Sequence, residues 1–335
     1  MRFQHTILAL GLAAGLAATP ALAQPVPVTI ALDWTPNTNH IGLFVAEAKG
    51  FYGQAGLEVD ILPYTDTSAG TLVANHVADF GIVGSIGLFT QRTAGADLVA
   101  TYALVQTETG RLVFKADRQD IQSPGDLDGK IYGGFGSAWE TALIGTIIRH
   151  DGGQGAFETV TLGTSAYEAL ANGAVDFTLE VYTWEGVKAE RDGPAQRAFR
   201  YADFGVPDQH TNFIGSSGSY LADNPETARA FITASQRGYD YAVAHPDEAT
   251  DILVAANADA ALDRDFVRAS LQALIDGHYL KAENGAVGTI DAAKMEAVGA
   301  FLFDADILKD ANGAPVTEKP DFTSYYSNQY LGIAP

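Results

Sequence analysis

The chain has 335 residues and a net charge of −21, because 41 acidic side chains outnumber 20 basic ones. Such a surface repels phosphate backbones and anionic lipid headgroups, so neither nucleic acid nor a membrane surface is expected as a partner. An apolar content of 47% excludes general disorder, and the length suggests two domains. The sequence contains no cysteine, so no disulfide can form.

The first 23 residues are predicted to be a signal peptide. Arg2 and His5 precede an apolar run at 7–18, and residues 20–23 (PALA) provide a helix break and a small-x-small cleavage site. The apolar run is shorter than the roughly 20 residues that span a bilayer. No cysteine follows the cleavage site as a lipid attachment point. We therefore expect export to the periplasm without a direct membrane anchor; the alternative is an N-terminal anchor helix.

After this leader, strand-like and helix-like segments alternate, which favours sheets flanked by helices. Strands are predicted at 28–32, 57–62, 79–83, 98–105, 111–115, 130–135 and 176–179. Helices are predicted at 40–53, 71–76, 87–95 and 138–150. From Pro225 onward the pattern is helical, with the last two helices at 265–277 and 291–303. This final block is expected to pack on the first lobe.

A repeated phrase indicates two lobes of similar topology. Residues 73–80 (VANHVADF) resemble residues 170–177 (LANGAVDF), and in each a helix is expected to end before an Asp-Phe pair that starts a strand. Chance similarity of a common helix-turn-strand phrase is the alternative. The predicted fold class is α/β with a ligand cleft between two lobes joined by two hinge strands. We assign 26–117 and 216–335 to lobe 1, and 118–215 to lobe 2.

Catalytic and metal-binding motifs fail on spacing. Residues 84–87 (GSIG) do not form a nucleophile elbow, and residues 134–136 (GFG) lack the third glycine of a dinucleotide loop. The seven histidines are scattered, and the aspartates near residue 306 do not match a calcium loop. We therefore predict no catalytic residue, no cofactor and no metal.

The first candidate ligand segment runs from Leu32 to His40. It leaves the first strand at its carboxyl end, where open α/β sheets bind ligands, and it enters a helix N-terminus. The candidate contacts are Trp34, Asn37, Asn39 and His40. The alternative is that one asparagine caps the helix while Trp34 fills the core.

The second candidate segment is 180–185, at the corresponding place in lobe 2. Tyr182 and Trp184 are suited to stacking on a flat ring, and Glu180 is suited to accepting hydrogen bonds from a ring N–H and an exocyclic amine. The alternative is that both rings pack against the next helix and Glu180 is solvated. Further candidates are Tyr64, Ser85 and Gly136. Phe135, Trp139 and His210 are weaker candidates, for each of which packing is the preferred interpretation.

Several of these segments resemble the NMT1/THI5-like branch of periplasmic binding proteins. The matching phrases are LDWTPNTNH at 32–40, FVAEAKGFY at 44–52, GLEV at 56–59, VADFG at 77–81 and SPGDLDGK at 123–130. The resemblance implies the type II periplasmic binding fold, a small-molecule ligand and an inner-membrane ABC permease as partner. Known ligands of the branch include thiamine pyrimidine precursors, and relatives carry riboflavin, sulfonates or other small solutes.

The same branch contains an enzyme, the fungal thiamine-pyrimidine synthase. Its cysteine-rich iron site would fall on residues 213–218 (FIGSSG), and its reactive lysine and histidine align with Val83 and Gly87. Because these groups are replaced, the resemblance favours a monomeric binding protein over an enzyme. A periplasmic enzyme with another site and a sensory binding protein remain the alternatives.

Overall fold

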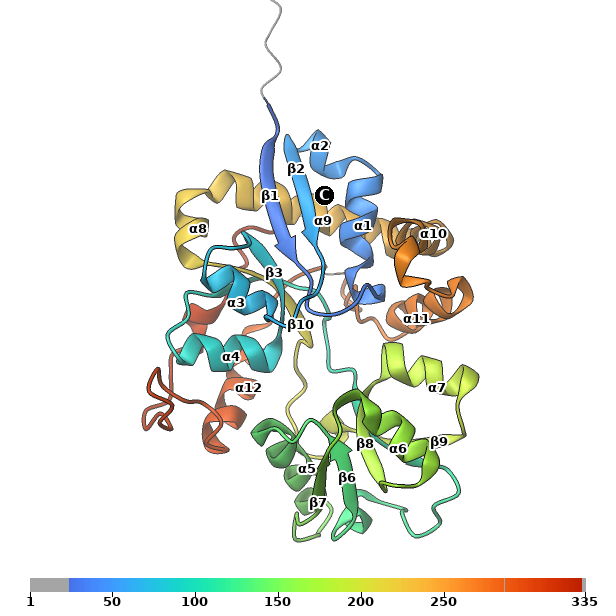
Figure 1. The fold of residues 1–335 in the computed structure, drawn as a ribbon. Helices are drawn as coiled ribbons and strands as arrows, with labels where there is room; N and C mark the ends of the chain where they lie inside the picture. The colour runs from blue at the N-terminus through green and yellow to red at the C-terminus, as the bar shows by residue number, and fades with distance from the viewer. Residues whose placement is uncertain (1–23, 286, 333–335) are drawn as a thin grey trace, which may run out of the picture.

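Two α/β lobes, one above the other in Figure 1, make up the computed structural model, which describes residues 24–285 and 287–332. The predicted signal peptide, 1–23, lies outside the described residues. Each lobe is built on a five-stranded sheet, with strand orders β2-β1-β3-β10-β4 and β7-β6-β8-β5-β9. The prediction of two α/β lobes with similar topology is confirmed.

The strands occupy matching positions in the two sheets. In lobe 1 they are β1 (Val26–Ala31), β2 (Leu57–Leu62), β3 (Phe80–Gly84), β4 (Val99–Ala103) and β10 (Asn212–Ser216). In lobe 2 they are β5 (Gly110–Lys115), β6 (Ile131–Gly134), β7 (Glu158–Thr161), β8 (Phe177–Val181) and β9 (Gln196–Arg200). The first three strands of each sheet order run parallel, and the fourth runs antiparallel to both of its neighbours.

The chain passes between the lobes twice: the first crossover joins β4 to β5, and the second joins β9 to β10. The antiparallel strand of each sheet, β5 or β10, directly follows one of these crossovers. β5 pairs with β8 and β9 in lobe 2, whereas β10 pairs with β3 and β4 in lobe 1. The predicted boundaries after residues 117 and 215 are therefore wrong, each by one strand. Local hydropathy identifies 111–115 as a strand and leaves 212–216 unassigned, and the sheet that a strand joins depends on its distant pairing partners.

Helices cover both sheets. Those of lobe 1 are α1 (Ile41–Ala48), α2 (Phe51–Gln54), α3 (Ala69–Ala74), α4 (Ser85–Thr93) and α8 (Gly218–Asp223). Those of lobe 2 are α5 (Ala138–His150), α6 (Ala166–Asn172) and α7 (Val187–Asp192). The C-terminal block contains α9 (Pro225–Ala244), α10 (Pro246–Ala256), α11 (Arg264–Asp276) and α12 (Ala292–Asp304). The predicted helix 40–53 is divided into α1 and α2, because Gly50 adopts a positive φ of 67°.

Shorter turns connect these elements. They are η1 (Thr38–His40), η2 (Pro124–Leu127), η3 (Gly163–Ser165), η5 (Tyr201–Asp203), η6 (Ala258–Ala260) and η7 (Phe322–Tyr325), together with the single π-helical turn η4 (Tyr182–Gly186). Of these, η1 and η4 each follow a strand end that faces the other lobe.

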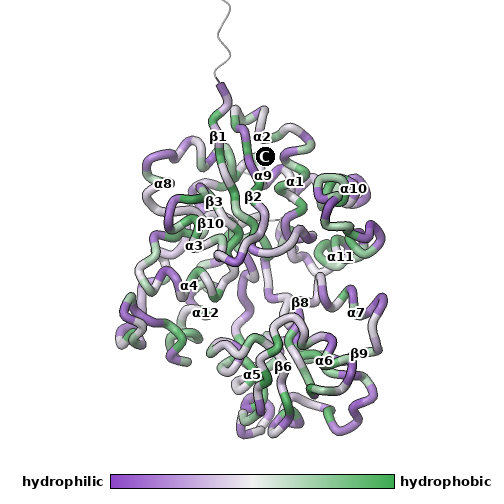
Figure 2. The backbone as a smooth tube through the Cα atoms, in the orientation of Figure 1, coloured by the Kyte–Doolittle hydropathy of each residue, from purple (hydrophilic) through white to green (hydrophobic). Residues whose placement is uncertain are grey.

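Each lobe has its own core, and Figure 2 shows hydrophobic stretches along the strands with hydrophilic ones in the outer loops. In lobe 1, Phe80 of β3 stacks on Phe231 of α9 with ring centroids 4.3 Å apart, which attaches the C-terminal block to the first sheet. In lobe 2, Tyr132 and Phe177 pack together beneath α5. The prediction that the C-terminal helices pack on lobe 1 is confirmed.

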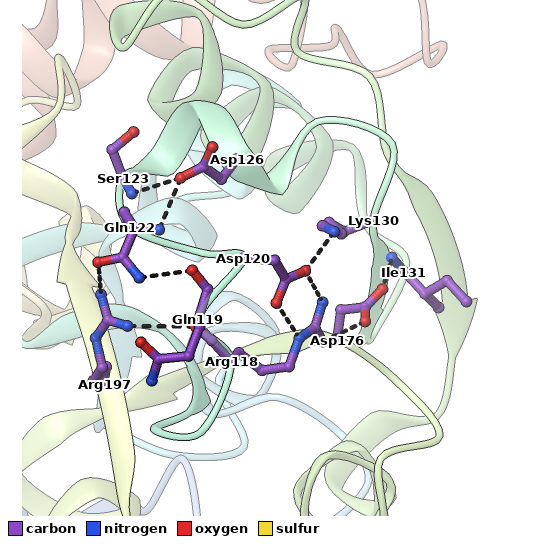
Figure 3. A network of polar contacts seen from close by, with 10 residues as sticks. All are labelled: Arg118, Gln119, Asp120, Gln122, Ser123, Asp126, Lys130, Ile131, Asp176 and Arg197. Carbon is purple, nitrogen blue, oxygen red and sulfur yellow. Dashed lines mark hydrogen bonds and ion pairs between the residues drawn. The ribbon is translucent and has the colours of Figure 1, made fainter.

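The repeated phrase has the same structural role in both lobes. Asp79 precedes β3 and accepts a 2.8 Å hydrogen bond from the backbone N–H of Thr29 in β1. Asp176 precedes β8 and accepts one of the same length from the backbone N–H of Ile131 in β6. Asp176 is also paired with Arg118, in a network that continues over the surface of lobe 2 (Figure 3). Each aspartate thus attaches its strand to the parallel neighbour.

Candidate functional site

A cavity of about 250 Å³ lies in the cleft between the lobes. Lobe 1 and the second crossover contribute Asp33, Trp34, Asn37, Asn39, Thr211 and Asn212, and lobe 2 contributes Phe135, Thr164, Tyr167, Leu179, Val181, Trp184 and Glu185. A second cavity of about 280 Å³ shares Asp33 and Trp34 and extends along lobe 1 past Tyr64. The lining residues follow the carboxyl ends of parallel strands in both lobes, as expected for ligand sites in α/β sheets.

Aromatic side chains are exposed on both walls of this cleft. Trp34 and Tyr64 are 36% and 39% exposed, with ring centroids 5.2 Å apart. Phe135 of lobe 2 is 53% exposed and lines the same cavity as Trp34. Large apolar side chains gathered in an exposed concave surface are typical of ligand sites. The structure therefore brings together the predicted residues Trp34 and Tyr64 and adds Phe135, which was interpreted as a packing residue.

Both asparagines of the first segment line the cavity, and one of them also caps a turn. The side chain of Asn37 accepts a 2.9 Å hydrogen bond from the backbone N–H of Asn39 and donates one to the carbonyl of Thr35. The alternative reading, capping by an asparagine, is thus correct for Asn37. It coexists with a place in the cavity wall, which Asn39 shares.

His40 does not reach the cavity. Its side chain is completely buried, and Nε2 lies 2.8 Å from Oδ1 of Asp33. Because a carboxylate accepts, Nε2 carries the proton, and Nδ1 accepts from the backbone N–H of Asn37 at 3.4 Å. The predicted ligand contact through His40 is therefore wrong, and the histidine instead positions Asp33.

The other oxygen of Asp33 holds an asparagine from the second crossover. Nδ2 of Asn212 donates to Oδ2 of Asp33 at 2.8 Å. Asn212 is only 8% exposed, lines the cavity, and has no hydrogen-bond partner for Oδ1 among the described residues.

Glu180 lies on the other face of its strand. Leu179 and Val181 line the cavity, and since successive strand residues point to opposite faces, Glu180 points away from it. Its buried carboxylate accepts a 2.8 Å hydrogen bond from Nε of Arg111, and Glu180 lines another cavity of about 360 Å³, which shares Tyr167 and Glu185 with the cleft cavity. Glu180 is therefore absent from the wall of the cleft cavity itself, and its contact with a ligand stays a prediction.

Tyr182 and Trp184, both in the π-helical turn η4, have different environments. The guanidinium of Arg111 lies 4.2 Å from the ring centroid of Tyr182, and this ring packs against the lobe 1 core outside the cavity. The ring of Trp184 lies 4.4 Å from that of Phe266 in α11 and also lines the cavity. The prediction for Tyr182 is thus contradicted, and Trp184 lies where the sequence placed it.

Glu185 is the acidic group that faces the cavity. Burial, reinforced by the negative charge of Glu180, raises the pKa of Glu185 to about 7. Oε2 of Glu185 is buried and has no hydrogen-bond partner among the described residues. A carboxyl group that titrates near neutral pH can present either a donor and an acceptor or two acceptors to a ligand.

Two further predicted contacts have structural roles instead. Ser85 is buried, and its backbone N–H donates to the carbonyl of Thr211 at 3.0 Å. Gly136 adopts a φ of 74°, and a β-carbon there would lie 2.6 Å from Oγ1 of Thr161, so the glycine serves a turn. Neither residue lines the two cleft cavities. Both predictions are contradicted.

Sequence reasoning missed six polar residues of this cavity, which are Asp33, Thr164, Tyr167, Glu185, Thr211 and Asn212. Glu185 lies within the second candidate segment, but the direction of its side chain depends on a π-helical turn that hydropathy does not reveal. Asn212 begins β10, which belongs to the lobe 1 sheet, whereas the sequence analysis assigns residue 212 to lobe 2. Tyr167 is part of no recognised motif. The alternation of apolar Leu179 and Val181 with Glu180 is a sequence signal that places Glu180 on the opposite face of the strand from its two neighbours.

Two kinds of feature were not found in the part of the chain that the structure describes, namely a metal-binding cluster and a membrane-spanning helix. Within residues 24–285 and 287–332, no three histidine or acidic side chains are gathered in a metal-binding arrangement. Over the same residues, no helix combines the length and the hydropathy of a membrane span.

With this geometry established, known proteins provide a comparison. The family model described as NMT1/THI5 like matches residues 37–249. The formylaminopyrimidine-binding protein of Halalkalibacterium halodurans is 28% identical over 305 residues, which is 89% of each chain. The 4-amino-5-hydroxymethyl-2-methylpyrimidine phosphate synthase THI13 of Saccharomyces cerevisiae is 26% identical over 237 residues, covering 66% of this chain and 68% of that one.

A solved structure extends the comparison to the whole fold. The periplasmic aliphatic sulphonate binding protein SsuA from Escherichia coli superposes with a TM-score of 0.69 at 15% identity, covering 90% of this chain and 92% of that one. Likeness at this identity shows the fold. The predicted type II periplasmic binding fold is confirmed.

Proposed function

The chain belongs to the NMT1/THI5-like family, and from this premise we propose that it is a periplasmic solute-binding protein that delivers a small aromatic heterocycle to an ABC-type permease. The proposed ligand is an aminopyrimidine of the kind used as a thiamine precursor. The formylaminopyrimidine-binding relative, which aligns over 89% of both chains, supports this ligand class and an import role.

The observation that carries the proposal is the composition of the cleft cavity. It is lined by both lobes and has an aromatic wall at Trp34, and two of its lining residues, Glu185 and Asn212, each have a buried side-chain oxygen without a hydrogen-bond partner among the described residues. A ligand that satisfies atoms on both lobes stabilises the closed arrangement, which a permease can then distinguish from the open one.

An aminopyrimidine matches this cavity in size and in hydrogen bonding. A volume of about 250 Å³ is below the 300–1,000 Å³ typical of drug-sized ligands and suits a single substituted ring. The ring would stack on Trp34, a protonated Glu185 would donate to a ring nitrogen, and the exocyclic amine would donate to Asn212. A sulfonate would face the carboxylates of Asp33 and Glu185.

An enzymatic role has less support, although one relative is a synthase. The described residues that line the two cleft cavities include no lysine, histidine or cysteine. By the family resemblance, these are the side-chain types of the synthase's reactive lysine, reactive histidine and iron-binding cysteines. We therefore favour binding without turnover.

Isothermal titration of the mature protein tests the proposal. We expect 4-amino-5-hydroxymethyl-2-methylpyrimidine or its N-formylamino analogue to bind with a Kd of about 1 µM or lower, corresponding to roughly −8 kcal/mol, and riboflavin and ethanesulfonate to bind at least tenfold more weakly. Mass spectrometry should recover the ligand unchanged. Tighter binding of riboflavin or the sulfonate would overturn the ligand class, and chemical conversion would overturn the assignment as a binding protein.

Two variants locate the binding site in the same assay. Trp34→Ala removes the aromatic wall and should weaken aminopyrimidine binding by at least tenfold. Tyr241→Ala removes a ring of similar size from α9, outside both cleft cavities, and should leave the affinity unchanged.

A further inference from the structure

We infer that Asp33, held by His40, fixes the orientation of the Asn212 amide and thereby makes the cleft select heterocycles with an amino group over those with an oxo group at the same position. The inference rests on the proposed function for its ligand class and names the residues that set specificity within that class.

The orientation of Asn212 follows from its partner. Both oxygens of the Asp33 carboxylate can only accept hydrogen bonds, so the group of Asn212 that lies 2.8 Å from Oδ2 is the donor, Nδ2. The reversed amide would place a carbonyl oxygen against a carboxylate oxygen. Oδ1 of Asn212, a cavity-lining residue that is only 8% exposed, is therefore the remaining acceptor of this amide, and it is buried without a partner among the described residues.

The Asp33 carboxylate is itself held in place by a hydrogen bond from His40. Nε2 of His40 donates to Oδ1 of Asp33 at 2.8 Å, and Nδ1 of His40 accepts from the backbone N–H of Asn37. These two contacts allow a single neutral tautomer of the buried His40 ring, the one with its proton on Nε2. The line from Asn37 through His40 and Asp33 to Asn212 therefore connects the turn after β1 to the start of β10, across the intervening strand β3.

The orientation of the Asn212 amide decides whether a ligand group placed against it is attracted or repelled. An exocyclic amine donates to Oδ1 of Asn212 and satisfies a buried acceptor, whereas an oxo group in the same place opposes oxygen to oxygen. Sites built to hydrogen-bond one substrate group discriminate strongly against analogues that leave the buried partner unpaired. Asp33, His40 and Asn212 thus act as positioning residues, with Asn212 making the contact.

Asp33→Asn is the variant that reverses the pattern without leaving a partner unsatisfied. The oxygen of the new amide can still accept from Nε2 of His40, and its nitrogen can donate to Oδ1 of Asn212. The Asn212 amide then turns and presents Nδ2 to the cavity. Asp223→Asn is the matched control, because Asp223 of α8 is exposed, lies outside both cleft cavities and loses the same charge.

The probes are 4-amino-5-hydroxymethyl-2-methylpyrimidine and its 4-oxo counterpart, titrated into the mature protein. We expect the wild type and Asp223→Asn to prefer the amino compound by at least about tenfold, and Asp33→Asn to lower this ratio of Kd values by at least tenfold. Melting curves check that each variant is folded. An unchanged ratio in folded Asp33→Asn would overturn the inference, as would a wild type that binds both compounds equally.

A ligand-free measurement separates this inference from the proposed function. In ¹⁵N spectra of the unliganded protein, the side-chain amide protons of Asn212 should exchange with water faster in Asp33→Asn than in the wild type, because they turn from Asp33 into the cleft. Unchanged exchange shows that the amide does not turn and rejects the inference. If neither pyrimidine binds the wild type, the proposed function fails, and the exchange measurement still decides the orientation.

Discussion

Two glutamates five positions apart in lobe 2 have opposite roles, and the local backbone is the reason. Glu180 lies on the face of β8 that points away from the cleft cavity, where Arg111 neutralises its buried carboxylate. Glu185 lies one π-helical turn beyond the strand and faces the cavity without a cation beside it. Burial therefore acts on Glu185 largely uncompensated and raises its pKa to about 7.

This pKa predicts a pH dependence of stability. In the unfolded chain Glu185 ionises near its ordinary pKa of 4.5, whereas in the folded protein it stays protonated up to about pH 7. Its contribution to stability is therefore present below pH 4.5 and is lost as the pH rises to about 7, by as much as ~3 kcal/mol. Glu185→Gln, which stays neutral, should match the wild type at pH 4.5 and exceed it in stability at pH 8.

Urea unfolding at a series of pH values measures this difference. Glu190→Gln on α7 is the control, since its side chain is largely exposed and the chemical change is identical. A stability difference between Glu185→Gln and the wild type that does not change from pH 4.5 to pH 8 would show that Glu185 does not titrate in this window.

At the scale of elements, the crossing of α1 and α9 holds the first ligand segment in place. A β-carbon on Gly42 would lie 2.3 Å from Cγ of Tyr239, and one on Gly238 would lie 2.0 Å from the carbonyl oxygen of Gly42. The two helices approach this closely because both positions lack a side chain. Tyr239 also donates to the carbonyl of Asn39, at 2.8 Å, so the crossing supports the turn that contributes Asn37 and Asn39 to the cavity.

Gly238→Ala should therefore destabilise the protein, although alanine is the better helix former by about 1 kcal/mol. The new β-carbon would overlap backbone atoms, and overpacking of this kind costs about 1–3 kcal/mol. Gly53→Ala in α2 is the control, because nothing lies within 4 Å of its β-carbon position, and it should be neutral or stabilising. Thermal melts of both variants test the contrast; equal melting temperatures would contradict the close crossing.

At the scale of the whole molecule, an aromatic contact joins the lobes on each side of the cleft. Trp184 of η4 packs on Phe266 of α11, and Trp139 of α5 meets Phe301 of α12 with ring centroids 5.9 Å apart. In Figure 1, α7 lies below α11 on one side and α5 below α12 on the other. The C-terminal helical block thus provides the surface on which lobe 2 closes.

Phe266→Ala should shift the unliganded protein toward open arrangements. Aromatic pairs contribute about 0.5–1.5 kcal/mol beyond their buried area, so the loss changes the open-to-closed ratio by roughly two- to tenfold. Small-angle scattering should show a larger radius of gyration without ligand, restored by saturating aminopyrimidine. Phe51→Ala removes a ring from lobe 1 away from lobe 2 and should not change the radius. A Phe266→Ala radius equal to that of the wild type would show that this contact does not control closure.

Much of the secondary structure follows from local pattern. The predicted limits of α5 are those observed, and the repeated phrase identified two equivalent strands, each preceded by an aspartate with the same role. The structure also places Trp34, Asn37, Asn39, Tyr64 and Trp184 in the walls of the cleft cavities, since they follow strand ends, where α/β proteins bind ligands, and their contact with a ligand stays a prediction.

By itself, the sequence determined the elements, the two lobes and the aromatic character of the cleft, since hydropathy period and strand-end position are local properties. Only the tertiary structure decided that Glu185 rather than Glu180 faces the cavity, that His40 supports Asp33, and that Asn212 belongs to the site. Asp33 and Asn212 are 179 residues apart. They meet because β10 returns from lobe 2 to pair beside β3, and such long-range pairing depends on the surfaces of both sheets together.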